Sequence, residues 1–302
     1  MLDILTRAGC FVAIILLGQI LRRTGVFGPE TFGILSKVVM KITLPAALIA
    51  SAAGKPIDAS MLTIALLGLG GGILYILAGW LLNRKGSPGE RAFCIQNVPG
   101  YNIGTFALPF TQSFLGPVGV LTTSIFDLGN ALVCFGGSFS IAQAVKEGGK
   151  ADFRRILKTA SSSIPFLTHV IMVILNLNSL TPPKPILTLA EIMGGGNACL
   201  AMLMLGVGMN ISIDTKKLSI ILKILAARFG LAVVLALAYY FLLPFSLEIR
   251  QTLVILAFAP IGSTVPIFTA ELGEDVGLSS TINSLAIVIS IVVIVTLLTV
   301  ML

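Results

Sequence analysis

Ten long apolar stretches, separated by short polar connections, run through the chain. A membrane-spanning helix needs about 20 predominantly apolar residues, and stretches of roughly that length cover 6–22, 31–52, 59–82, 90–114, 118–143, 156–177, 186–209, 218–243, 250–271 and 278–301. One longer polar connection, 146–155, leaves five stretches on either side. We therefore predict an all-α membrane protein of ten transmembrane helices: a first five-helix repeat (1–145), a cytoplasmic linker (146–155) and a second, inverted five-helix repeat (156–302).

The fourth and ninth stretches contain helix-breaking residues. Residues 97–109 read NVPGYNIGTFALP and residues 259–266 read APIGSTVP. Proline lacks an N–H and clashes with the preceding turn, so both helices should part, the fourth with its break at Pro109 and the ninth with its break at Pro266. A parted helix at membrane depth is tolerated only where it is buried in protein or lines a wet cavity. Paired interruptions in corresponding places of two halves are typical of the binding site of a transporter.

Small polar residues surround these prolines and supply the candidate site. Unpaired backbone groups at broken helix ends suit a carboxylate or a cation. The alternative is that these residues only satisfy the freed backbone of a kink. The candidate substrate-binding residues are Asn102, Gly104 and Thr105 before Pro109; Gly262, Ser263 and Thr264 before Pro266; and Asp127 with Asn130 in the fifth stretch.

Three ionisable residues lie deep in apolar stretches. Asp127 is near mid-membrane, where a carboxylate is costly and usually faces the interior. It is either a proton or cation site, or an acceptor for a substrate hydroxyl, or a structural partner for Arg228 or Lys41. Arg228 is expected to pair with an acid that the sequence does not identify. His169 is expected to be a packed, hydrogen-bonded residue, so we assign it no function.

Composition and charge support a membrane protein. The chain is 56% hydrophobic and 11% charged, with a mean hydropathy of +1.02. Its net charge of +7 comes from basic residues in short connections, a pattern of cytoplasmic loops rather than of nucleic-acid binding. The positive-inside rule places both termini outside the cytoplasm, although the loop with Glu271, Glu274 and Asp275 is acidic. The four scattered cysteines predict free thiols and no metal site.

Several motifs resemble the auxin efflux carrier family, in its bacterial branch. They are LSKVV at 35–39 with LPA at 44–46, Asn102 seven residues before Pro109, LGVGM at 205–209, and Pro260 with VPIF at 265–268. The resemblance implies two inverted repeats, as in sodium/proton antiporters and bile-acid symporters, with a scaffold domain and a transport domain. It also implies that the fourth and ninth helices cross at Pro109 and Pro266. Plant members export auxin and look dimeric, and bacterial relatives are linked to small carboxylates.

We therefore expect a secondary transporter of the plasma membrane that moves a small organic anion by alternating access. Membrane lipid and a homodimeric second copy are the expected partners; no cofactor is expected, and coupling to Na⁺ or protons is left open. A sodium-coupled symporter of the bile-acid type is the main alternative. An intramembrane aspartyl protease would need a second mid-membrane carboxylate facing Asp127, and a non-transporting sensor would not need two broken helices.

Overall fold

The computed structural model describes residues 2–55, 57–212 and 214–302, and all regular structure in these ranges is helical. The helices are α1 (Leu2–Arg23), α2 (Thr31–Val38), η1 (Val39–Thr43), α3 (Leu44–Ala52), η2 (Ala59–Leu62), α4 (Thr63–Leu82), α5 (Pro88–Asn97), η3 (Ile103–Ala107), α6 (Leu108–Phe114), α7 (Gly116–Leu132), η4 (Val133–Gly137), α8 (Ser138–Glu147), α9 (Phe153–Ser161), α10 (Ile164–Leu177), α11 (Lys184–Gly194), α12 (Asn197–Gly208), η5 (Thr215–Lys217), α13 (Leu218–Leu242), α14 (Leu247–Ala257), α15 (Val265–Glu271) and α16 (Val276–Met301). Of the short elements, η1, η3 and η4 are π turns, and η2 and η5 are 3₁₀ turns.

Seven helical segments in the described ranges are long and apolar enough to cross a membrane, or eight if the bent pair α9–α10 counts as one. The α9–α10 pair bends by 78°. These eight segments correspond to eight of the ten predicted stretches. The two others are the fourth and ninth, whose interruption divides each into pieces too short to span alone. The chain is therefore an all-helical, multi-pass membrane protein.

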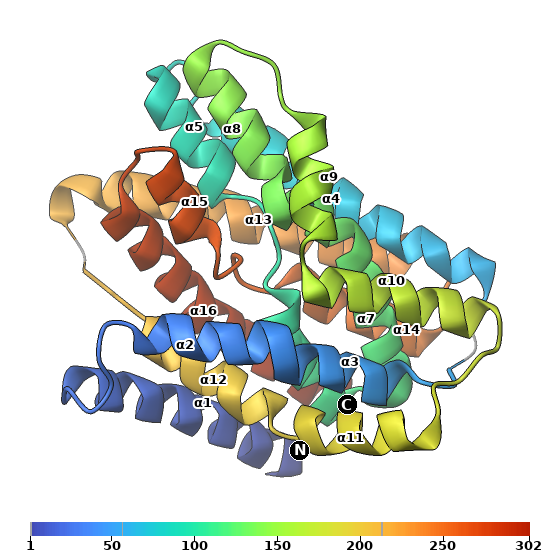
Figure 1. Ribbon diagram of the computed structural model, residues 1–302. Helices are drawn as coiled ribbons and strands as arrows, with labels where there is room; N and C mark the ends of the chain where they lie inside the picture. Colours follow the sequence, from blue (N-terminus) through green and yellow to red (C-terminus); the bar gives the residue numbers. More distant parts are fainter. Residues whose placement is uncertain (1, 56, 213) are drawn as a thin grey trace.

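The helices pack in two groups, each drawn from both halves of the sequence (Figure 1). In the first group, which we call the panel, α1 packs on α12, α12 on α2, and both α10 and α11 on α3. In the second, the bundle, α4 packs on α5, α7 and α13, α14 on α7 and α13, and α15 on α16. The blue and yellow helices of the panel lie along the lower part of Figure 1, with most of the bundle above them.

Glycines allow the closest helix contacts in both groups. A Cβ on Gly206 of α12 would lie 1.9 Å from the carbonyl oxygen of Ile15 on α1. In the bundle, a Cβ on Gly129 of α7 would lie 1.8 Å from the carbonyl oxygen of Ala65 on α4. Apolar side chains gain little by leaving lipid, so close backbone packing of this kind stabilises membrane helices. The contact between α4 and α7 fixes the helix that carries Asp127 and Asn130.

Candidate functional site

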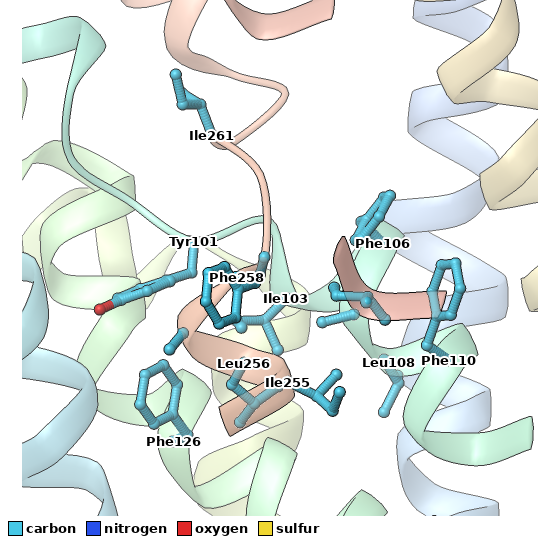
Figure 2. Packing of buried hydrophobic residues seen from close by; sticks show 14 of the residues in the cluster. Tyr101, Ile103, Phe106, Leu108, Phe110, Phe126, Ile255, Leu256, Phe258 and Ile261 are labelled. Carbon is cyan, nitrogen blue, oxygen red and sulfur yellow. The ribbon is translucent and has the colours of Figure 1, made fainter. Parts of the chain in front are cut away.

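Both predicted interruptions are present, and they touch each other. Helix α5 ends at Asn97 and the backbone is not helical again until η3 begins at Ile103. Helix α14 ends at Ala257 and α15 begins at Val265. The backbone N–H of Asn102 donates to the carbonyl oxygen of Pro260 at 2.8 Å, which joins the two unwound segments directly. Figure 2 shows the apolar side chains around this contact, including Tyr101 and Ile103 from the first segment and Phe258 from the second.

The first interruption lies upstream of the predicted position. Pro109 is the second residue of α6, inside a helical stretch that η3 begins, so the expectation that the chain parts at Pro109 is wrong. The preceding π turn accommodates the proline ring, because its wider turn shifts the hydrogen bonding away from the missing N–H. The chain turns instead at Pro99–Gly100, where Gly100 adopts a φ of 84°. Pro266, by contrast, is the second residue of α15 and borders the second interruption.

Arg228 binds the carbonyl groups that the interruptions free. Its side chain is fully buried; Nη1 donates to the carbonyl of Val98 at 2.8 Å, and Nη2 donates to those of Ala259 at 2.7 Å and Pro260 at 3.3 Å. The guanidinium also lies 4.5 Å from the centre of the Tyr75 ring, a favourable cation–π distance. The expectation of an acidic partner is wrong for the described part of the chain, where no carboxylate forms an ion pair with Arg228. Backbone carbonyls at two half-helix ends accept the hydrogen bonds of Arg228 instead of a carboxylate.

Asn130 holds the first interruption through both of its side-chain atoms. Its Oδ1 accepts from the N–H of Tyr101 at 3.0 Å, and its Nδ2 donates to the Tyr101 carbonyl at 2.9 Å. The same Nδ2 donates to Oδ1 of Asp127 at 2.8 Å. The spacing of these residues places them on one face of α7, and that face is turned toward the unwound segment of the fourth stretch.

The partner of Asp127 is His169. Its Nε2 lies 3.1 Å from Oδ2 of Asp127, and the two side chains are 3% and 13% exposed. The structural alternative, in which Asp127 pairs with Arg228 or Lys41, is therefore wrong. His169 is hydrogen-bonded and buried, as expected, but its partner makes it part of the site. The two residues are 42 positions apart in different apolar stretches, so no local sequence pattern connects them.

All eight candidate substrate-binding residues line one cavity of about 50 Å³ beside the contact between the interruptions. Within it, Thr105 donates to Oδ1 of Asn102, while the buried Nδ2 of Asn102 has no hydrogen-bond partner. An unpaired buried donor costs free energy unless a ligand or water satisfies it. The other lining residues, which the sequence analysis did not select, are Met40, Leu44, Tyr101, Ile103, Cys134, Phe135 and Pro165.

A second cavity of about 550 Å³, which we call the vestibule, adjoins the first at Ser263. Arg22 and Arg23 lie on its wall, as do Asn210 and Pro266. Asn283 of α16 also lines it; its Nδ2 donates to the carbonyl of Gly262 at 3.2 Å, and its buried Oδ1 has no partner. Sequence reasoning missed Asn283, although a single asparagine in the long apolar stretch 278–301 is a signal that could have identified it.

The comparison with known families agrees with this architecture. Residues 10–152 match the family described as membrane transport protein. The match extends from α1 through the first interruption and α8. Among curated proteins, none matches the chain.

Proposed function

We propose that this protein is a secondary transporter that moves a small organic anion, a carboxylate or an auxin-like weak acid, across the plasma membrane by alternating access. The observation that carries the proposal is the convergence of eight polar and glycine residues from three separate stretches on one cavity, where two broken helices meet. Broken helices that meet at a cavity are characteristic of secondary transporters.

The dimensions of the two cavities suggest how an anion would fit. A water molecule occupies about 30 Å³ in the liquid, so the cavity of about 50 Å³ has room for a carboxylate group but not for a whole organic anion. The vestibule, at about 550 Å³, has the size of an ordinary ligand pocket. We place the carboxylate at the unpaired Nδ2 of Asn102 and the body of the anion on the vestibule side of Ser263.

Electrostatics favour an anion over Na⁺ at the contact between the interruptions. Unwound carbonyls at broken helix ends are the usual ligands for a transported cation. Here the guanidinium of Arg228 already occupies three of them, from Val98, Ala259 and Pro260. A permanent positive charge therefore takes the place that Na⁺ would need, which weighs against the sodium-coupled alternative at this position.

We further propose a topology of two inverted five-helix repeats, with the panel as scaffold, the bundle as transport domain and the vestibule open to the cytoplasm. Both groups take corresponding helices from each half, as an inverted repeat requires. The acidic residues at the connection between α15 and α16 support a shared cytoplasmic side, because each pairs with a basic residue near the end of another helical element: Glu271 with Arg155 of α9, Glu274 with Lys146 of α8 and Asp275 with Lys217 of η5. Both termini are then extracytoplasmic.

Exchange across liposomes tests the proposed site. The full chain is reconstituted in liposomes loaded with malonate, malate or indole-3-acetate, and uptake of the same labelled anion is measured against protein-free liposomes. Asn102→Ala should reduce exchange of the transported anion by about tenfold, the equivalent of one hydrogen bond of roughly 1.4 kcal/mol. The variant keeps the backbone N–H that bonds Pro260, so the contact between the interruptions is retained.

Asn178→Ala is the matched control, because Asn178 is exposed at the end of α10 and lies outside both cavities. It should exchange the anion at the wild-type rate. The site is wrong if Asn102→Ala and Asn178→Ala exchange all three anions equally well, and the function is wrong if the wild type exchanges none of them.

A further inference from the structure

A buried acid–base pair is attached to the unwound backbone of the first interruption. His169 contacts Asp127, Asp127 accepts from Asn130, and Asn130 binds both backbone groups of Tyr101. The pair therefore connects a titratable group in the panel helix α10 to the backbone that forms the cavity. Asp127 itself lines the cavity, whereas His169 lies behind it.

The charges around the cavity make anion binding dependent on a proton. Arg228 carries one permanent positive charge, and Asp127 carries a negative charge that offsets it while His169 is neutral. The guanidinium of Arg228 lies 5.2 Å from the centre of the Tyr101 ring, and Asp127 is linked to the Tyr101 backbone through Asn130, so both charges lie near the same residue of the cavity wall. With the pair unprotonated, an incoming anion would leave an excess negative charge in a poorly solvated place, which is costly. One additional proton on the pair removes that excess.

The geometry of the pair can take up this proton. Nε2–H of His169 can donate to the Asp127 carboxylate while Nδ1 accepts a second proton, which gives an imidazolium next to a carboxylate. We propose that the Asp127–His169 pair binds one proton and that this proton crosses the membrane together with each anion. The proposal rests on the proposed transport function. The proton enters with the anion on one side and leaves with it on the other, and the pair returns to its initial state.

The other ionisable groups near the pair do not replace it. Asn130 links the pair to the backbone of Tyr101, and Sγ of Cys134 lies 3.2 Å from Oδ1 of Asn130. Lys41 and Lys158 are exposed, and Arg155 is bound to Glu271. The ionisable groups on the elements packed against α7 and α10 are Lys41 on η1, Tyr75 on α4, Tyr101 in the interruption, Cys134 in η4, Arg154, Arg155 and Lys158 on α9, and Glu248 and Arg250 on α14.

Accumulation driven by a pH gradient tests the proposal. Liposomes containing the full chain, with the membrane potential held at zero and the interior one pH unit more alkaline, are given labelled malonate, malate or indole-3-acetate. One proton per anion should concentrate the transported anion about tenfold inside, beyond the level in protein-free liposomes. His169→Gln and Asp127→Asn should each remove this accumulation. Thr168→Val, a neighbouring buried change on α10, should keep it.

Anion exchange without a gradient separates the two proposals. If the wild type exchanges an anion but does not accumulate it with the gradient, or if His169→Gln still accumulates it tenfold, the proton site is wrong and the transporter stands. If no anion exchanges, the transport function is wrong and the proton site falls with it. His169→Gln should slow exchange as well, because its pair cannot take up the proton that anion binding requires, whereas Thr168→Val should keep both exchange and accumulation.

The single histidine of the chain gives a second measurement that does not depend on the variants. In the full chain with a histidine-free purification tag, ¹⁵N-labelled histidine reports the protonation of His169 alone. The transported anion should increase the protonated fraction at a fixed pH near 7, because linkage between anion and proton is reciprocal. Equal protonated fractions with and without a saturating exchanged anion would overturn the proposal.

Discussion

The two interrupted segments share a break between short helices, but different groups satisfy their backbones. In the first segment, the side chain of Asn130 holds Tyr101 and links it to Asp127 and His169. In the second, Arg228 and Asn283 bind the carbonyls of Ala259, Pro260 and Gly262, and the described contacts of this segment include no titratable pair like that of the first. The second segment instead borders the vestibule at Ser263 and Pro266.

In the proposed transporter, this difference would divide two tasks between the two segments. The first segment is linked through Asn130 to the groups that can change charge, and the second faces the larger cavity through which an anion would arrive. Arg228 is the exception to this division, because it binds carbonyls of both segments. Its guanidinium therefore holds the two segments together, alongside the bond from Asn102 to Pro260.

Replacing Arg228 should have the largest effect, because this buried side chain donates to carbonyls of both segments. Arg228→Leu leaves the carbonyls of Val98 and Ala259 without this donor, at about 1–3 kcal/mol for each unsatisfied group, while the Pro260 carbonyl keeps the N–H of Asn102. We expect the unfolding free energy to fall by roughly 3–5 kcal/mol, or the protein to lose a monodisperse folded state. Arg228→Lys should recover only part of this, because an ammonium lacks the planar fork that reaches both segments. Thermal unfolding in detergent and size-exclusion chromatography measure both variants.

A leucine at position 228 with wild-type thermal stability would show that the carbonyls find other partners. The two segments would then be held together mainly by the bond from Asn102 to Pro260 and by apolar packing.

The contrast between the segments also separates the features that the sequence could predict from those that depend on packing. Span lengths and the proline–glycine clusters are local features, so the apolar stretches, both interruptions and the eight lining residues followed from the pattern. The interruption was misplaced at Pro109 because a π turn can absorb a proline that an ideal α-helix cannot. The partners of Arg228 were not predictable, since backbone carbonyls have no sequence signature. The pairing of Asp127 with His169 depends on how α7 and α10 pack, which no local pattern encodes.

Asn130 and Asn283 each hydrogen-bond the backbone of one interrupted segment, so replacing each in turn compares the contributions of the two side chains to stability. Asn130→Leu removes the partner of the buried Tyr101 N–H and the donor to Asp127, so the unfolding free energy should fall by about 2–4 kcal/mol. Asn283→Leu removes one bond of 3.2 Å to Gly262 and also the unpartnered Oδ1, so its cost should stay below about 1 kcal/mol. Chemical unfolding of the purified variants in the same detergent compares them. Equal costs would mean that the side-chain clamp on Tyr101 does not distinguish the first segment from the second.

A matched glycine pair tests the backbone of the two segments and should give the smallest effect. Gly100 has a φ of 84°, and a Cβ there would lie 2.9 Å from Sγ of Cys134. Gly100→Ala should therefore lower the unfolding free energy by about 1–2 kcal/mol. Gly262 has no positive φ and its Cβ would have no atom nearer than 3.8 Å, so Gly262→Ala should leave the fold stability within about 0.5 kcal/mol of wild type.

The loss of unfolding free energy caused by Gly100→Ala can be separated into a steric and a conformational part. Cys134→Ala removes the sulfur that the new Cβ would approach but leaves the φ of 84° unchanged. If Gly100→Ala costs the same in the wild type and in Cys134→Ala, the left-handed backbone is responsible, as expected from the φ value. If the cost disappears in Cys134→Ala, the turn tolerates alanine and only the contact with Cys134 is tight. The first segment would then differ from the second in its packing rather than in its backbone.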